Sequence, residues 1–332
     1  MELGIKHIAQ IAVGTWQSEV LYSFTELEIA DTLTAGPLTA AEVAGRLELN
    51  AAATEGLLNA AVAIRMLTSD GARFSLTQTA RRFLVGASDE SLAGWVRCMG
   101  QWARSWGHLT EVVRTGRPPA GTDSAMFTDV AKLEDLEIGF YRYALQLADE
   151  LAECIEPPLV GTLVDLGGGC GAYSMALCRH HPGLDVQVFD IPDTVPIANK
   201  VIAECGMSDR VVALPRSYFT ADLGEGLAGV LMSNMMHAES LETRRLLLEK
   251  AYAALAPGGR IILNGHFLND DRTSPSFNAL HHLSSIVLWE GGGDVTVTEA
   301  SDLLRDVGFG DATVASIGGN SSTVLVAAKP VS

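Results

Sequence analysis

Basic residues and long apolar runs are both scarce in this sequence. It contains 23 Lys and Arg against 40 Asp and Glu in 332 residues, which gives a formal net charge of −17 at pH 7. A polyanion would be repelled by that average field, so we expect no nucleic-acid partner. No apolar run approaches the ~18 residues of a transmembrane helix, and the first residues lack a cationic region followed by an apolar block. We therefore expect a soluble protein that contacts no membrane and is not exported.

Cysteines are few, and their spacing suggests no pairing. The five of them form no C-x-x-C pair, and an odd number is poor material for a disulfide framework. Thiols stay reduced in the cytosol, so we expect a cytoplasmic protein. With 48% hydrophobic and 19% charged residues the chain can build sizeable cores, which excludes disorder and collagen-like repeats. Its length suggests about two domains.

The amino-terminal third has a helical pattern. Between residues 5 and 94, Ala, Leu and Glu recur at helical spacing. Thr39 and Glu42 have the spacing of a capping box and predict a helix from Ala40. Asn50 predicts the cap of the next helix. Two short helices in succession are typical of a helix-turn-helix unit.

A short strand completes this unit as a winged helix. Residues 73–76 follow the turn Asp70-Gly71 and read as a strand of the wing. The second helix, residues 50–64, holds no Arg or Lys, so it has nothing with which to contact phosphates or read guanine. The sequence therefore favours packing or dimerisation for this domain. A ligand-responsive winged-helix regulator is the alternative from another functional class, and it would show specific, salt-sensitive DNA binding.

The remaining two thirds predict alternating strands and helices. After Pro157-Pro158, short apolar runs alternate with amphipathic segments, which is typical of a mostly parallel α/β sheet. The expected strands are 161–166, 185–189, 229–233 and 260–264, with a closing hairpin of 312–317 and 323–328.

A glycine-rich loop follows the first of these strands. Residues 167–172 satisfy G-x-G-x-x-A, and Asp190 follows at the end of the next strand, so a dinucleotide fold is one interpretation. Asp165 argues against it, because a pyrophosphate at this strand end would meet like charge. S-adenosylmethionine carries a sulfonium and an ammonium but no phosphate, and Asp190 can accept both of its ribose hydroxyls. The glycines that allow close backbone approach are Gly167, Gly169 and Gly171.

Three segments resemble class I small-molecule methyltransferases of the caffeate O-methyltransferase type. They are residues 163–171, 189–192 and 256–260. The resemblance covers nearly the whole chain, and it implies an S-adenosylmethionine-dependent homodimer. The implied fold is a Rossmann-like class I methyltransferase domain with an N-terminal α-helical winged-helix dimerisation domain. The expected domains are a winged-helix dimerisation domain (1–95), a helical linker and substrate-pocket region (96–156), and a cofactor-binding catalytic domain (157–332).

The resemblance also implies a general base and further cofactor contacts. The family's basic histidine falls at His237, and an imidazole can take a proton from a phenol or an acidic carbon at neutral pH. The family's next two residues are replaced by Ala238 and Glu239. Besides Asp165, Asp190 and the glycines, the positions that match cofactor contacts are Ile191, Ser217, Tyr218 and Ser233.

Histidines accumulate where the family places a carboxylate. The Glu that steers the family's base is replaced by Gly265, while Asp294 matches a second acidic partner. Two imidazoles and one carboxylate would make an open-sided transition-metal site for Zn or Fe. The predicted ligands are His237, Glu239 and one of His281 and His282, with His266 and Asp294 as alternatives.

Such a metal would suit the methylation of a 2-oxo acid at C3. It would chelate the carboxylate and ketone and stabilise the enolate. The sequence resembles, in this respect, the metal-using 2-oxo acid C-methyltransferases of antibiotic pathways, and Arg97 would hold the substrate carboxylate as a bidentate donor. The alternative is O-methylation of a phenolic small molecule by His237 alone.

Overall fold

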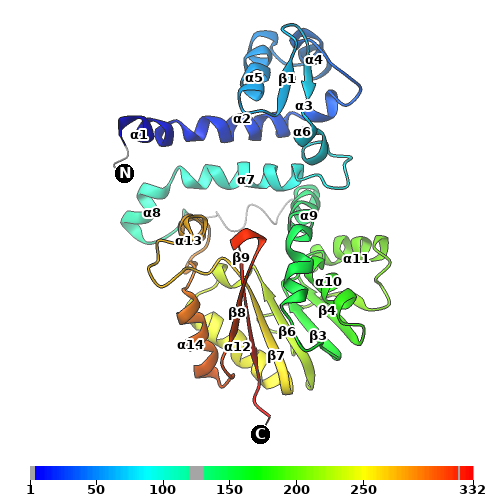
Figure 1. Ribbon diagram of the computed structural model, residues 1–332, viewed down its shortest axis with the longest axis vertical. Helices are drawn as coiled ribbons and strands as arrows, with labels where there is room; N and C mark the ends of the chain where they lie inside the picture. Colours follow the sequence, from blue (N-terminus) through cyan, green and yellow to red (C-terminus); the bar gives the residue numbers. More distant parts are fainter. Residues whose placement is uncertain (1–3, 120–129, 321, 332) are drawn as a thin grey trace. The chain divides into compact units, whose positions relative to one another are not determined.

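The structure is a computed structural model that describes residues 4–119, 130–320 and 322–331. The chain divides into two compact units, shown with their element labels in Figure 1. The first consists of Met1–Arg104 with Ile138–Arg142, and the second of Ser105–Glu137 with Tyr143–Ser332. Within the described residues, no helix is both long and apolar enough to cross a membrane.

The first unit is helical with one small hairpin. Its elements are α1 (Ile5–Ala12), α2 (Gly14–Glu26), α3 (Ile29–Thr32), α4 (Ala40–Arg46), α5 (Ala51–Ala63), β1 (Leu67–Ser69), β2 (Phe74–Leu76), α6 (Gln78–Phe83) and α7 (Ala93–Trp106), whose last two residues belong to the second unit. Both predicted caps are confirmed, because Thr39 and Glu42 form a capping box and the Asn50 side chain accepts the Ala53 N–H. The predicted strand at 73–76 is β2, paired antiparallel with β1. The winged-helix classification stays a prediction.

The second unit is a seven-stranded sheet with helices. The strands are β3 (Gly161–Leu166), β4 (Leu184–Asp190), β5 (Val211–Pro215), β6 (Leu227–Ser233), β7 (Leu255–Gly265), β8 (Thr313–Ile317) and β9 (Ser322–Ala328). The helices are α8 (Leu109–Thr115), α9 (Val130–Glu153), α10 (Ala172–His180), α11 (Thr194–Glu204), α12 (Leu241–Ala254), α13 (Ser276–Leu288) and α14 (Val297–Val307), with short 3₁₀ turns η1 (Met236–Ala238) and η2 (Gly318–Asn320). The Rossmann-like α/β fold class is therefore confirmed.

Sheet topology explains where a ligand would bind. The order is β5-β4-β3-β6-β7-β9-β8, parallel from β5 to β7 and antiparallel at β9 and β8. The chain runs outward from β3 to β4 and β5, then returns to place β6 on the other side of β3. This reversal is a topological switch point, and ligands bind in α/β sheets outside the carboxyl ends of the strands there.

Two strand features differ from the sequence prediction. Strand β5 was not among the predicted strands, and in the structure it pairs with β4 from Val186↔Val211 to Asp190↔Pro215. Strand β7 begins at Leu255, before the Pro-Gly-Gly segment that was expected to lie outside it. Its pairing with β6 shifts register between Leu227 and Gly229, so the glycines are accommodated by an irregularity rather than by a break.

Candidate active site

The glycine loop lies between β3 and α10. Gly167, Gly169 and Gly171 have φ values of 66°, 52° and 73°, a backbone region that residues with a Cβ adopt at a cost. A Cβ on Gly168 would collide with the carboxyl group of Asp165. The loop therefore depends on glycine for its shape.

Asp165 has a buried carboxyl group beneath this loop. Its Oδ2 accepts the Ser174 hydroxyl at 2.6 Å, while Oδ1 is buried without a hydrogen-bond partner among the described residues. Burial raises the pKa of Asp165 to about 7. An orphaned acidic oxygen of this kind calls for a donor or a cation, which the ammonium and sulfonium of S-adenosylmethionine would supply.

Asp190 holds the loop from the end of β4. Its Oδ2 accepts the Gly169 N–H at 2.9 Å and its Oδ1 accepts the Ile191 N–H at 2.7 Å. Burial raises the pKa of this carboxyl group, and the two backbone donors oppose that shift. Each carboxylate oxygen has further lone pairs, so Asp190 keeps the capacity to accept ribose hydroxyls.

Glu137 on α9 is a third acidic group at the loop, and sequence reasoning missed it. Its Oε1 accepts the Thr194 hydroxyl at 3.2 Å, and its Oε2 lies 2.8 Å from the position a Cβ would take on Gly169. Burial and the nearby Asp190 raise the pKa of Glu137 to about 8. No local motif marks this glutamate, because only the fold brings it to the loop. The residues around the loop fit a cationic cofactor with ribose hydroxyls.

The other predicted cofactor residues differ in how buried they are and in what they contact. Tyr218 lies near the loop, with Cε1 3.9 Å from the Cβ position of Gly167, and its hydroxyl donates to Glu239 at 2.9 Å. Ser233 is buried and its hydroxyl accepts the Asn264 amide at 2.8 Å. Ile191 and Ser217 are exposed at their strand ends. Their contacts with the cofactor stay predictions.

His237 lies on the loop that follows β6. Strands β3 and β6 pair in parallel up to Leu166↔Met232, so their following loops emerge together. Asn234 turns the chain with a left-handed φ of 52°, and His237 follows in η1. The Cβ of Met235 lies 3.8 Å from the Cβ position of Gly167. The loop of the predicted base therefore runs beside the glycine loop.

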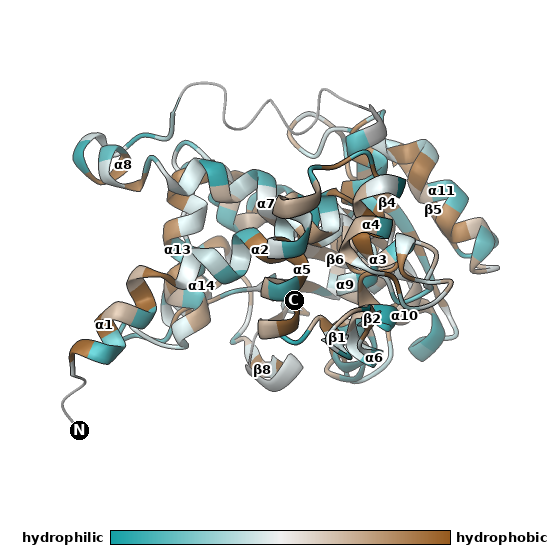
Figure 2. Cartoon of the chain, turned by 90° about the horizontal axis from the view of Figure 1, so that it is seen from above, coloured by the Kyte–Doolittle hydropathy of each residue, from teal (hydrophilic) through white to brown (hydrophobic). Residues whose placement is uncertain are grey.

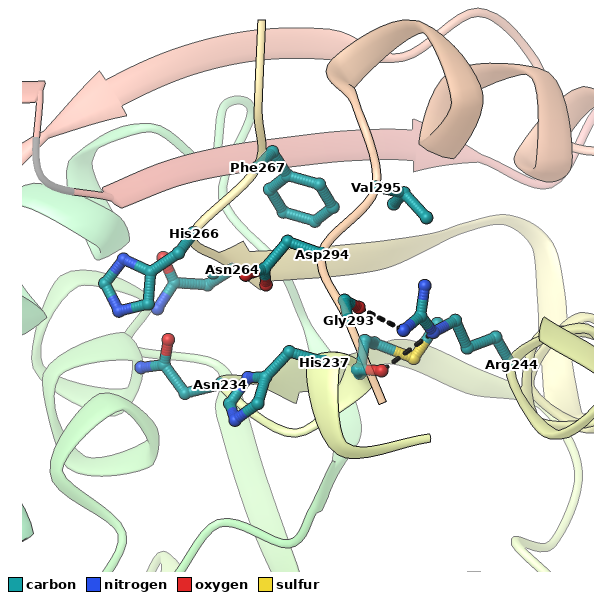
Figure 3. A pocket seen from close by; sticks show the side chains of 11 residues that line it. Asn234, His237, Arg244, Asn264, His266, Phe267, Gly293, Asp294 and Val295 are labelled. Atoms are coloured by element: carbon teal, nitrogen blue, oxygen red, sulfur yellow. Dashed lines mark hydrogen bonds between the residues drawn. The ribbon is translucent and has the colours of Figure 1, made fainter. Parts of the chain in front are cut away.

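A small cavity of about 20 Å³ opens beside His237. Figure 3 shows side chains around it from the loop after β6, from the end of β7 and the residues just after it, and from the segment before α14, among them His237, Asn234, His266, Asn264 and Asp294. Arg244 closes one side, donating from Nε to the Met236 carbonyl at 2.8 Å and from a terminal nitrogen to the Gly293 carbonyl. The wall thus combines hydrogen-bonding groups with apolar ones.

His237 is electrostatically suited to act as a base. Its pKa is well below the ordinary histidine value, first because of burial and then because of the positive charge that His281, His266 and Arg244 can carry. The imidazole is therefore neutral at pH 7 and has a lone pair for a proton.

The predicted metal site is not assembled. The described part of the chain contains no group of three His, Cys, Asp or Glu side chains that could hold a metal. Glu239 instead accepts the Tyr218 hydroxyl, and the His282 Nδ1 accepts the Asp294 N–H at 2.9 Å. His281 Nδ1 pairs with Asp294 Oδ2 at 2.8 Å. With these groups engaged elsewhere, the set His237, Glu239, His281 and His282 does not converge, and the metal prediction is not supported.

Arg97 and Gly265 complete the comparison with the predicted site. Gly265 ends β7 beside the cavity, and a Cβ there would lie 3.7 Å from Phe267 and 4.0 Å from the Asn234 amide oxygen. No carboxylate is present at that position. Arg97 lies on α7, and its role toward a substrate carboxylate stays a prediction.

Comparison with known proteins identifies the family. The O-methyltransferase domain matches residues 106–310, and the O-methyltransferase dimerisation domain matches residues 9–86. The chain is a S-adenosylmethionine-dependent methyltransferase. It belongs to the O-methyltransferase family, and its amino-terminal segment matches the dimerisation domain of that family.

Individual relatives cover nearly the full length. The 3-hydroxy-5-methyl-1-naphthoate 3-O-methyltransferase of Streptomyces sahachiroi is 30% identical over 91% of this chain and 88% of its own. The tetracenomycin polyketide synthesis 8-O-methyl transferase TcmO of Streptomyces glaucescens is 26% identical over 97% and 96%. The crystal structure of human N-acetylserotonin methyltransferase in complex with SAM superposes with a TM-score of 0.89, at 25% identity and 99% coverage of both chains.

Proposed function

We propose that this protein transfers a methyl group from S-adenosylmethionine to a hydroxyl group of an aromatic small molecule in secondary metabolism. When bound, the cofactor supplies an electrophilic methyl group on its sulfonium. The glycine loop, Asp165 and Asp190 would hold it. His237 would accept the hydroxyl proton while the substrate oxygen bonds to the methyl carbon, whose bond to sulfur would break to leave S-adenosylhomocysteine.

The proximity of the glycine loop and the His237 loop carries this proposal. Met235 has its Cβ 3.8 Å from the position a Cβ would take on Gly167, and His237 follows Met235 by two residues. A phenol has a pKa of about 10, so it is mostly protonated at pH 7 and needs a base to become a good nucleophile. A neutral imidazole beside the methyl donor meets that need without a metal ion.

The relatives support the choice of a hydroxyl acceptor. The printed names of the Streptomyces sahachiroi and Streptomyces glaucescens proteins both specify O-methyl transfer, one to a hydroxynaphthoate and one in polyketide synthesis. The hypothesis of 2-oxo acid C-methylation has less support, because its metal ligands do not converge.

We also propose that the protein acts as a homodimer through its amino-terminal unit. Helix α1 carries hydrophobic residues, brown in Figure 2, and Ile5, Ile8 and Ile11 on it are 83%, 67% and 66% exposed. Trp16 on α2 is 68% exposed. Exposed large apolar side chains that lie close together in the sequence are consistent with an interface, and this segment overlaps the dimerisation match.

The function is tested by assaying methyl transfer to a panel of phenols and 2-oxo acids, with and without added metal. We expect hydroxyl methylation without added metal, and loss of about 10²–10⁴-fold in turnover in His237→Gln, as for loss of a general base. Binding of adenosylhomocysteine by His237→Gln, followed by calorimetry, should be unchanged. Turnover of 2-oxo acids alone, and only with metal, would contradict the proposal.

A further inference from the structure

Asp294 and His281 form a carboxylate–imidazole pair next to the predicted base. Asp294 Oδ2 is 2.8 Å from His281 Nδ1, and the two side chains are only 4% and 17% exposed. A carboxylate only accepts hydrogen bonds, so Nδ1 carries the shared proton. The pairing fixes the direction of the His281 ring, as carboxylates commonly do for functional histidines.

Two backbone hydrogen bonds fix the position of the Asp294 segment. Its backbone N–H donates to His282 Nδ1 at 2.9 Å, and the preceding Gly293 N–H donates to the His237 carbonyl at 2.8 Å. Arg244 joins the same two segments by bonding the carbonyls of Met236 and Gly293. The Asp294 segment and the His237 loop are therefore held together as one unit.

The His281 ring in turn contacts His237. The two ring centroids are 4.8 Å apart at an interplanar angle of 85°. The centroid of the Trp289 ring is 5.0 Å from that of His237. No hydrogen bond joins the His237 ring to a carboxylate within the described residues. The acidic partner that a base would use is thus engaged by His281, and Gly265 offers none.

We propose that the Asp294–His281 pair is the positioning device for His237, replacing a carboxylate that would otherwise stand at position 265. Asp294 holds His281, and the edge contact with His281 holds the His237 ring toward the cavity. This inference rests on the proposed function for its catalytic meaning, but the contact itself can be tested without an acceptor substrate.

His281 can affect His237 through its charge as well as through the ring contact. The groups that face His237 are His281 on α13, His266 after β7, Arg244 on α12 and Asp294 before α14. Burial lowers the pKa of His237 most, and the positive charge that His281 can carry is the next cause. Replacement of His281 should therefore raise the pKa of His237, so that on acidification the His237 imidazole becomes protonated at a higher pH than in the wild type.

The direct test is an NMR titration of histidine rings in the full-length wild type, His281→Gln, Asp294→Asn and the double variant. We expect the His237 pKa to rise by about 0.5–1 unit in His281→Gln. His180→Gln, which removes a histidine at the end of α10, is the matched control and should leave the His237 titration unchanged. An unchanged His237 titration in His281→Gln would overturn the inference, whether or not any phenol is methylated.

Kinetics then distinguish a positioning role from a structural one. If the pair acts as a unit, kcat/KM should fall about tenfold in either single variant and no further in the double variant, and the acid limb of the pH profile of His281→Gln should move to higher pH. Asp294→Glu should recover part of the loss. Additive losses, or losses that only follow a lower Tm, would contradict the proposal. Absence of methylation in the wild type, with the NMR result intact, would refute the proposed function alone.

Discussion

The carboxyl groups of Glu137 and Asp190 meet at the backbone of Gly169. Asp190 accepts the Gly169 N–H at 2.9 Å, and Glu137 Oε2 lies 2.8 Å from the site of a Cβ on that glycine. Two like-charged groups this close disfavour simultaneous ionisation. Burial raises the pKa of Glu137 to about 8, and the nearby Asp190 carboxylate adds to this shift.

Gly169→Ala should damage cofactor binding through this contact. The new Cβ would meet Glu137 Oε2 and also strain a φ of 52°. Gly206→Ala is the matched control, because Gly206 has a φ of 67° but open space around its Cβ position. Calorimetry should show adenosylhomocysteine affinity falling at least tenfold in Gly169→Ala and unchanged in Gly206→Ala. Equal affinities in the two variants would show that the contact is unimportant.

Glu137→Gln should change how stability depends on pH. The folded pKa of about 8 lies above the ordinary 4.5, so the proton stabilises the fold fully below pH 4.5, and this stabilisation is lost as pH rises through 8. Glutamine cannot ionise. The free energy of unfolding of the variant should match that of the wild type near pH 5 and exceed it by about 2 kcal/mol near pH 9. This difference is smaller than the whole shift from 4.5 to about 8 would give at about 1.4 kcal/mol per pKa unit. Thermal unfolding across this range measures the difference, and parallel curves would contradict it.

Asp190→Ala should weaken cofactor binding sharply. The variant loses the acceptor for Gly169 and Ile191 and the group proposed to hold the ribose hydroxyls. We expect adenosylhomocysteine affinity to fall by about 10- to 100-fold, as for loss of charged hydrogen bonds of about 1.5–3 kcal/mol. Asp193→Ala removes the same charge from an exposed neighbouring position and serves as the control. Comparable losses in both variants would point to net charge rather than to a specific contact.

Gly293→Ala should disturb catalysis more than cofactor binding. Gly293 has a φ of 147°, and a Cβ there would lie 3.1 Å from the His282 ring, which accepts the Asp294 N–H. We expect a fall of about tenfold in kcat/KM, by displacement of Asp294, with adenosylhomocysteine affinity preserved. Gly71→Ala, at a φ of 98° with open space, is the control for backbone strain. A loss confined to cofactor affinity would contradict this assignment.

Local signals in the sequence predicted most of the framework. The capping box of Thr39 and Glu42, the Asn50 cap and the strand-loop-helix around Gly167 depend on residues within a few positions of one another, and each is present as predicted. Strand β5, Val211–Pro215, was missed because its own apolar run is short.

Long-range contacts in the site could not be read from the sequence. Glu137 reaches the glycine loop only because α9 brings it there, and Asp294 pairs with His281 rather than His237 because of how α13 and the segment before α14 fold together. The metal hypothesis failed for the same reason, because the hydrogen bond from Tyr218 to Glu239 joins residues whose contact no local pattern indicates.

The atom that receives the methyl group is the most direct test of the account. Wild-type protein would be supplied with S-adenosylmethionine labelled with ¹³C in its methyl group and with a phenolic acceptor that has a free ring carbon beside its hydroxyl. NMR of the product would then locate the label. The account predicts a methyl group bonded to oxygen, formed without added metal and lost in His237→Gln. A label bonded to carbon, or O-methylation that persists in His237→Gln, would contradict it.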